Sequence, residues 1–322
     1  MNTLMNDFLR RSKLHDSNII YVQMYKNGIL KAEYKRFPVK TRLEIWSIAK
    51  AFTSMGAGIA LNERIISIDE AIYPVFESYF PENPPENLYK IRVRDLLTMS
   101  SGLSAPLFFC DDPERYQVKD WIHYFFHHGD FKYEPGIHFC YSNFNSYILS
   151  AMIETRTGQN LLEYLRYRLF EPLSIGNPDW TLCPMGHCKA ANGLYTTIDE
   201  LSNLGHLILN AGEFNGKQIV PAEYIREACK KQIDSLVPRT GWNDYERYGY
   251  GFMLRPGPIP GTIISAGNYG QCCIVDFIHN TVITVMSLDG NHHQKIKNDM
   301  IDAMADYYGI KIQPPDSAEI TF

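Results

Sequence analysis

The feature that most constrains this chain is an apolar, small-residue run at positions 51–61 that directly follows Ser47 and Lys50. A helix that is apolar around its whole circumference has to be buried, so the run predicts a helix inside a sizeable core. Residues three apart share one helix face, which brings the Lys50 ammonium within reach of the Ser47 hydroxyl. A serine becomes a nucleophile when a neighbouring base takes its proton. Apolar surroundings that disfavour the charged form of Lys50 would help it in that role.

Ser-x-x-Lys alone is weakly diagnostic, because average composition gives about one such match by chance in a chain of this length. The competing interpretation makes Ser47 the N-cap of the helix, a position that serine favours, and leaves Lys50 in solvent. The other motifs along the chain have to decide between a nucleophile and a cap.

Length and composition set further bounds. The 322 residues, 45% of them hydrophobic, suffice for one large domain or for a core with an inserted subdomain. A net charge of −5 without a Lys/Arg block argues against a nucleic-acid partner. The chain start has no apolar signal region, and no stretch approaches the roughly 18 apolar residues of a membrane span. We therefore expect a cytoplasmic protein without a membrane partner.

Cysteine usage is consistent with that compartment. Seven cysteines, an odd number without framework spacing, fit reduced thiols. Cys183, His187 and Cys188 suggest a zinc knuckle, but no second Cys/His pair stands at matching spacing. We predict no metal and no organic cofactor.

Turn residues and hydrophobic periodicity predict an α+β fold. Short strands at both ends of the chain, joined by tight turns, imply antiparallel pairing, and they enclose a mostly helical middle. The expected architecture is an antiparallel β-sheet flanked by helices with an inserted all-helical subdomain. We assign a single domain, 1–322, with an α/β part at 1–69 and 196–322 and a helical subdomain at 70–195. The predicted strands are 18–24, 29–34, 248–254, 261–266, 271–278 and 281–288; the predicted later helices are 145–157, 160–170, 198–210, 221–231 and 292–308.

A second motif, Tyr141-Ser142-Asn143, lies in a loop before the helix predicted from residue 145. The tyrosine pKa near 10 means that proton exchange at neutral pH needs a positive neighbour, and Lys50 is the candidate. Asn143 is a candidate to bind a substrate amide and to orient Lys50. The alternative is an ordinary loop tyrosine followed by a helix-capping asparagine.

A third motif is the segment 262–271, predicted to be an edge strand beside the nucleophile. Gly267 would let a substrate backbone approach closely. The backbone N–H of Asn268, with that of Ser47, would form an oxyanion hole. The alternative is a glycine-rich β-turn.

In their order along the chain, these motifs resemble the serine β-lactamase and penicillin-binding-protein-like family, and most closely its class C β-lactamase, D-aminopeptidase and esterase branch. The resemblance extends over residues 17–308 and implies a five-stranded antiparallel sheet, an all-helical subdomain and a site between them. It is carried by the segments 47–50, 94–103, 135–143, 157–158, 171–173, 191–197, 248–251 and 267–271.

The chain departs from that family in the third motif. Penicillin-binding enzymes place a Lys or His two residues before the glycine to hold a substrate carboxylate, whereas this chain has Ser265 there. Arg255 or Lys295 are candidates to supply the missing charge. The resemblance otherwise implies Ser47, Lys50 and Tyr141 as catalytic residues and Asn143, Ser265, Gly267, Asn268, Tyr195 and Tyr250 as substrate-binding residues.

The leading hypothesis is a serine hydrolase that acts through an acyl-enzyme on an ester, amide or peptide-like small molecule, in preference to a β-lactam. One alternative is a penicillin-recognising fold used as a binding or sensing protein with little turnover. A slow penicillin-binding protein is the other. The oligomeric state and the identity of the acyl donor stay open.

Overall fold

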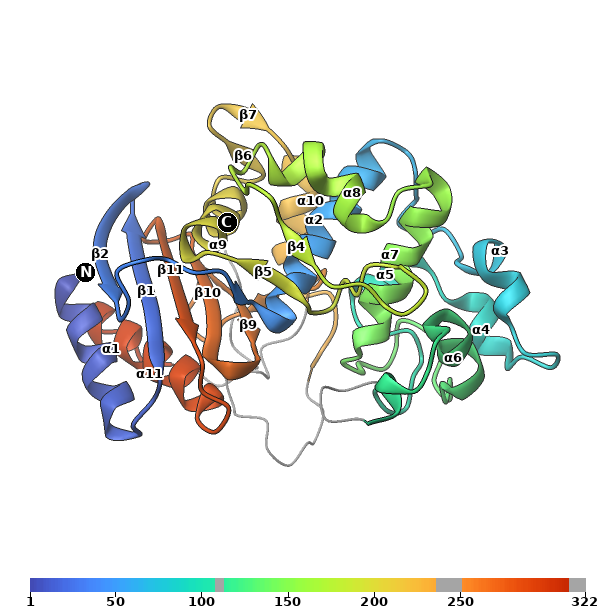
Figure 1. Cartoon of the computed structure of the whole chain (residues 1–322), viewed down its shortest axis with the longest axis horizontal. Helices are drawn as coiled ribbons and strands as arrows, with labels where there is room; N and C mark the ends of the chain where they lie inside the picture. The colour runs from blue at the N-terminus through green and yellow to red at the C-terminus, as the bar shows by residue number, and fades with distance from the viewer. Residues whose placement is uncertain (108–112, 236–250, 313–322) are drawn as a thin grey trace.

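The computed structural model describes residues 1–107, 113–235 and 251–312, and its centre is a six-stranded antiparallel sheet in the order β2-β1-β11-β10-β9-β8. Strands from both chain ends pair in it, since β1 lies against β11. The predicted α+β class is therefore confirmed (Figure 1). The strands are β1 (Ile19–Lys26), β2 (Ile29–Lys35), β8 (Arg255–Pro256), β9 (Thr262–Gly267), β10 (Gln271–Asp276) and β11 (Thr281–Ser287).

Two details differ from the prediction at the β8 edge. The sheet has six strands and not the five that the resemblance implied, because the two-residue β8 pairs with β9. The prediction of a strand at 248–254 was wrong for residues 251–254, which form no strand. Residues 248–250 lie outside the described residues. The N–H of Phe252 donates to Ala228 O at 3.0 Å and that of Met253 to Leu97 O at 2.9 Å, so helices take the bonds that a sheet would need.

Both faces of the sheet are covered. On β10, Cys272 and Ile274 point into a core under α1 (Asn2–Leu14) and α11 (His293–Tyr308). Cys273 and Val275 point the other way, into the larger core that includes α9 (Ile198–Leu209). Successive side chains of a strand alternate between faces, so a strand covered on both sides has an almost unbroken apolar sequence.

Helix α1 was not predicted. Its inward positions Leu4, Met5 and Phe8 are almost fully buried, and α1 and α11 lie together on one side of the sheet in Figure 1. The spacing is that of an amphipathic helix, which shows that the pattern was present in the sequence.

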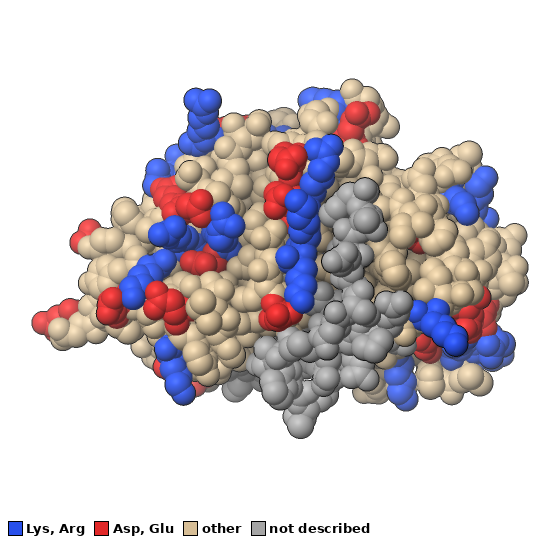
Figure 2. Space-filling model, turned by 180° about the vertical axis from the view of Figure 1, so that it is seen from behind, with Lys and Arg blue, Asp and Glu red and all other residues tan. Residues whose placement is uncertain are grey.

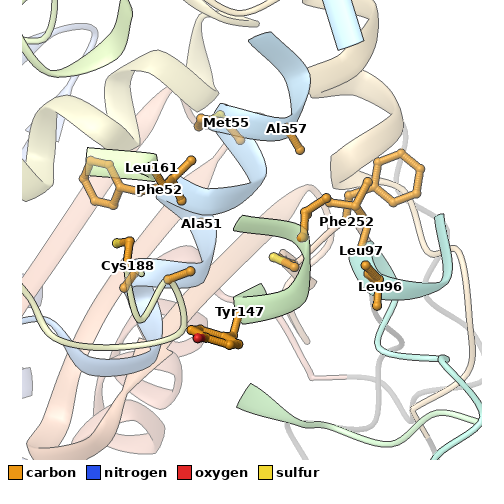
Figure 3. Packing of buried hydrophobic residues seen from close by; sticks show 14 of the residues in the cluster. Ala51, Phe52, Met55, Ala57, Leu96, Leu97, Tyr147, Leu161, Cys188 and Phe252 are labelled. Atoms are coloured by element: carbon orange, nitrogen blue, oxygen red, sulfur yellow. The ribbon is translucent and has the colours of Figure 1, made fainter. Parts of the chain in front are cut away.

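Helix α2 (Ala49–Asn62) is the predicted central helix, and it is buried from Ala49 to Ala60. Small residues let its neighbours approach: a Cβ on Gly58 would lie 2.5 Å from the Tyr224 ring of α10 (Ala222–Cys229). Ser54 Oγ also donates to Phe252 O at 2.7 Å. Figure 3 shows side chains of α2 with Leu97, Tyr147 and Phe252 in one core.

The helical part lies beyond α2, at the end of the molecule opposite β1 and β2 (Figure 1). Helix α7 (Asn143–Thr157) ends where predicted, closed by Gly158 with φ +70°, but begins two residues earlier than expected. The helices of this helical part are α3 (Tyr73–Phe76), α4 (Glu86–Lys90), α5 (Val93–Leu97), α6 (Trp121–His128), α7 (Asn143–Thr157) and α8 (Leu161–Leu165). Helix α8 continues into the π-helical η4 (Arg166–Phe170).

Short strands accompany these helices. β3 (Leu43–Glu44), β5 (Leu194–Thr196) and β4 (Asp179–Trp180) form a second sheet, and β6 (Glu213–Phe214) pairs with β7 (Lys217–Gln218). The second sheet joins β3, from the expected α/β part, to β4, which lies within the expected helical subdomain at 70–195. The division at residues 70 and 195 therefore stays a prediction.

The surface and the thiols add two observations. Basic and acidic side chains are interspersed over the face seen in Figure 2. The cysteines of the described residues, Cys140, Cys183, Cys188, Cys229, Cys272 and Cys273, are all free and buried, and burial raises the pKa of the Cys272 thiol to about 12. Across the described ranges, no helix combines the length and the apolar character that crossing a membrane would require.

Candidate active site

Ser47 lies in a tight turn, η1 (Trp46–Ile48), that leads directly into α2. Trp46 has φ +51°, a backbone conformation that residues other than glycine seldom adopt. The Trp46 ring stacks on that of Tyr269, with centroids 4.9 Å apart. The N-cap of α2 is Ile48, and no side chain caps the helix. The N-cap interpretation of Ser47 was therefore wrong.

Lys50 is buried, with 2% of its surface exposed, so the interpretation of a solvated lysine was also wrong. Its Nζ donates to three acceptors: Ser47 Oγ at 3.2 Å, Asn143 Oδ1 at 2.8 Å and Ala191 O at 3.1 Å. An ammonium has three N–H donors, which these acceptors share with Tyr141, since Tyr141 also hydrogen-bonds with Lys50. These contacts hold Nζ beside the Ser47 hydroxyl.

Tyr141 lies over the same lysine. The Lys50 Nζ is 4.6 Å from the centre of the Tyr141 ring and the Arg255 Cζ is 5.1 Å from it. Burial acts to raise the pKa of Tyr141, but the charges of Lys50 and Arg255 and hydrogen bonds with Lys50 and Ser47 outweigh it, and the pKa falls below 10. A tyrosine with a lowered pKa, hydrogen-bonded to a serine, is suited to take that serine's proton.

Two local structures fix the Tyr141 loop. Ser142 is the N-cap of α7, with its Oγ accepting from the Phe144 N–H at 3.3 Å. On the other side, the Cys140 N–H donates to Met99 O at 2.8 Å. Since Asn143 is the first residue of α7, the same cap sets the direction from which its side chain reaches Lys50.

Strand β9 approaches the nucleophile turn at Gly267. A Cβ at this glycine would lie 2.4 Å from Ile45 O and 3.2 Å from Ser47 N. The absence of a side chain thus lets the chain's own backbone come close, a reason that the sequence did not indicate. Asn268 follows in η6 (Asn268–Gly270). The approach of a substrate backbone, and the role of the Asn268 N–H, stay predictions.

Ser265 faces the same side of β9 as Gly267 and is 8% exposed. It pairs across the sheet with Cys273. Strand β8 pairs with Ile263 and Ile264 only, so within the described segments no strand pairs with the last part of the β9 edge. This wall of the site carries no charged side chain of its own at positions 265–267.

The remaining predicted residues fall in different places. Arg255 is at the site, over Tyr141, whereas Lys295 is exposed on α11. Tyr195 is half-buried on β5, paired with Glu44 of β3. Tyr250 lies outside the described residues.

Some contributors to the site had no sequence signal that we used. The Ala191 carbonyl binds Lys50 through the backbone, which leaves no side-chain signature. The Trp46–Tyr269 stack joins positions 223 residues apart. The segments 191–197 and 267–271 contain Ala191 and Tyr269, and 47–50 directly follows Trp46, so these motifs indicated the neighbourhood but not the contacts.

The suggested zinc knuckle has a different arrangement. Cys183 Sγ is 3.2 Å from the Tyr147 hydroxyl, and His187 Nδ1 lies 3.0 Å from Glu154 Oε2. Over the described ranges, His, Cys, Asp and Glu side chains form no group of three or more placed to hold a metal ion.

Comparison with known proteins adds the family. Residues 24–303 match the family model described as Beta-lactamase. A D-aminopeptidase from Brucella anthropi is 29% identical over 146 residues, which make up 44% of this chain and 26% of that protein. This chain spans less than two thirds of the length of the curated relatives it matches.

Solved structures show the same fold. The octameric penicillin-binding protein homologue from Pyrococcus abyssi has a TM-score of 0.72 at 19% identity, covering 98% of this chain and 78% of the other. EstCE1, a hydrolase with promiscuous acyltransferase activity, has a TM-score of 0.74 at 15% identity, covering 94% and 98%. Because the family model spans most of the 322 residues, the chain belongs to the Beta-lactamase family.

Proposed function

We propose that this protein is a serine hydrolase that forms an acyl-enzyme on Ser47 and hydrolyses small ester, amide or peptide-like substrates. The observation that carries the proposal is the position of Lys50 Nζ, which contacts both Ser47 Oγ and Asn143 Oδ1 while Tyr141 hydrogen-bonds to Lys50 and Ser47. The relatives include a D-aminopeptidase and a hydrolase with acyltransferase activity, which supports this class of reaction.

In the acylation step, Ser47 Oγ attacks the substrate carbonyl carbon as its proton passes to Tyr141 Oη. The carbonyl π electrons move onto the oxygen, where the N–H groups of Ser47 and Asn268 donate hydrogen bonds. Each such donor contributes about 3 kcal/mol in enzymes where it has been removed. The bond to the alcohol or amine then breaks, and the leaving group takes the proton from Tyr141.

In the deacylation step, Tyr141 takes a proton from water as the water oxygen attacks the acyl carbon. The Ser47 ester bond breaks, and Ser47 Oγ regains a proton from Tyr141. One water molecule is consumed, and the products are a carboxylic acid and an alcohol or amine. Lys50 keeps its charge throughout and stabilises the tyrosinate form.

The substrate preference follows from the uncharged strand wall. Ser265 offers a hydroxyl where a cation would bind a carboxylate beside β9, and this favours esters and small amides over penicillins. The same observation favours the second candidate, a penicillin-recognising fold that binds or senses with little turnover.

The test is intact-mass spectrometry after exposure to a fluorophosphonate probe, to penicillin and to p-nitrophenyl acetate. We expect one probe adduct that is absent from Ser47→Ala and present in a control, Ser104→Ala, which alters a serine hydrogen-bonded to Asp130. Continuous release of p-nitrophenol supports the hydrolase. A stoichiometric burst that stalls on penicillin supports a slow penicillin-binding protein. No adduct with any of the three reagents in folded protein would overturn the hydrolase and support the second candidate.

A further inference from the structure

A partly open recess is lined in part by two residues that accept hydrogen bonds from Lys50. Asn143 and Ala191, which both accept from Lys50 Nζ, line this recess together with residues of α6, of α7 and of the segment before α6. A group seated there is therefore adjacent to the atoms that hold the proposed catalytic lysine. A substrate group bound there would lie beside the Ser47 site, because Lys50 also contacts Ser47 Oγ.

The walls of the recess are largely aromatic. Trp121 of α6 and Phe144 and Tyr147 of α7 line it, and the Trp121 and Tyr147 ring centroids are 5.4 Å apart. Their polar atoms are engaged by the protein: Trp121 Nε1 donates to Val118 O at 3.1 Å, and the Tyr147 hydroxyl lies 3.2 Å from Cys183 Sγ. The ring surface at the wall of the recess favours an apolar group.

Arg115 and Lys189 also line the recess, and among the described residues no carboxylate is in contact with either. Lys189 Nζ is 5.9 Å from the Trp121 ring and Arg115 Cζ is 4.5 Å from that of Tyr116. Neither Arg115 nor Lys189 has a carboxylate within 4.0 Å in the described part of the chain, and Arg115 Nε is buried without an acceptor there. A buried donor without a partner is costly, and a ligand carboxylate bound to the guanidinium would offset that cost through its charge.

The nearby acidic side chains are engaged elsewhere. Glu44 Oε1 accepts from the Gly193 N–H at 2.8 Å. Burial raises the pKa of Glu44, while that N–H and the charges of Lys189 and Arg115 oppose the rise. Glu154 pairs with His187, and Asp120 caps α6. As far as the described residues go, the positive charge at the recess is therefore available to a ligand.

We propose that this recess selects substrates whose group on the scissile carbonyl has an apolar body and a terminal carboxylate, which Arg115 and Lys189 bind. The proposal rests on the proposed function, because it makes the recess a subsite of the Ser47 reaction. A substrate carboxylate is then recognised by Arg115 and Lys189, next to Asn143 and Ala191, and not at β9.

The experiment compares three p-nitrophenyl esters with six-carbon acyl groups: hexanoate, the monoester of adipate, and 6-aminohexanoate. We expect the adipate ester to have the highest kcat/KM in the natural protein. Arg115→Gln with Lys189→Gln should lower that value by about tenfold or more, because charge-assisted hydrogen bonds are lost, and should change the hexanoate value less than about threefold. The charge-reversed pair, Arg115→Glu with Lys189→Glu, should prefer the 6-aminohexanoate ester.

A double variant that removes two exposed cations elsewhere, Lys31→Gln with Lys217→Gln on β2 and β7, is the matched control for net charge. Equal losses on hexanoate and adipate esters, or no preference for adipate, would overturn the proposal while leaving the hydrolase intact. If no ester is hydrolysed, the proposed function fails. Calorimetry with adipate then tests whether the recess still binds dicarboxylates. Binding to Ser47→Ala that is lost when Arg115 and Lys189 are also changed to Gln would show that it does, and no binding would overturn the proposal.

Discussion

The helical wall and the strand wall of the site differ in how much chemistry they carry. On the helical wall, η1, α2 and α7 bring Ser47, Lys50 and Asn143 into direct hydrogen-bond contact. On the strand wall, β9 offers Ser265 and Gly267, and the glycine is in contact with the chain's own turn. The groups suited to acyl transfer are thus concentrated on one wall, and the other contributes mainly backbone.

This difference indicates that proton transfer and substrate anchoring are separable in this fold. The cations near the site do not come from β9: Arg255 of β8 is over Tyr141, and Arg115 and Lys189 line the recess beside Asn143. If the comparison is right, changes on the helical wall should affect every substrate. Changes on the strand wall should act through geometry alone.

The largest effect is expected from Tyr141→Phe. Losing a general base costs about 10³-fold in rate, because Ser47 then has no phenolate to accept its proton. In the natural protein, kcat/KM should rise with pH as Tyr141 deprotonates and level off below pH 10, since Lys50 and Arg255 lower the pKa of Tyr141. A pH profile of p-nitrophenyl acetate hydrolysis measures both, and an unchanged profile in Tyr141→Phe would remove Tyr141 from the mechanism.

Gly267→Ala should have the next largest effect. The new Cβ would meet Ile45 O at 2.4 Å, so β9 and the Ser47 turn must move apart. A displacement of this size costs about 10²-fold in kcat/KM, and the overpacking about 2 kcal/mol in the free energy of unfolding. Urea unfolding and ester kinetics test this.

The matched control for this substitution is Gly176→Ala. Its Cβ would have open space and the backbone φ is not in the left-handed region, so both measurements should stay near the natural values. Full activity of Gly267→Ala would show that β9 does not set the geometry of the Ser47 turn.

Arg255→Gln should have a smaller effect with a defined sign. Removing a positive charge near Tyr141 disfavours its phenolate form, so the rise of kcat/KM should shift to higher pH and activity at neutral pH should fall about tenfold. Lys295→Gln, on the exposed side of α11, is the control. A shift of equal size in both variants would point to net charge and not to the contact with Tyr141.

Ser265→Ala should have the smallest effect, less than about threefold on neutral esters. The structure gives the Ser265 hydroxyl no hydrogen bond within the described residues, and positions 265–267 on β9 contribute mainly backbone. Steady-state kinetics with p-nitrophenyl acetate measures it. A loss above tenfold would show that the strand wall recognises substrate through this hydroxyl, and the two walls would then be more alike than we infer.

Sequence reasoning succeeded for the part of the site that is local or marked by side-chain motifs. Ser47 and Lys50 lie one helical turn apart, so their contact follows from helix geometry. The approach of Tyr141 and Asn143 was predicted from their motif alone and is seen in the contacts of Lys50. Roles in catalysis for these residues stay proposals.

The rest depended on tertiary packing that one sequence does not reveal. The Ala191 carbonyl binds Lys50 as a backbone atom, and the Arg115 and Lys189 pair comes from two segments on either side of α7. The close packing of Gly267 against Ile45 could be predicted only by knowing which backbone segment lies beside β9. At 251–254, the strand prediction failed because the ends of α5 and α10 took those backbone hydrogen bonds.

The buried thiols give this protein a built-in reporter of local opening. Cys272 and Cys273 are neighbours on β10, yet one points into the core under α1 and α11 and the other into the core with α2 and α9. A thiol alkylates only after exposure and ionisation. The order in which mild denaturant makes these two residues reactive, read by peptide mass spectrometry, therefore tells which side of the sheet comes apart first.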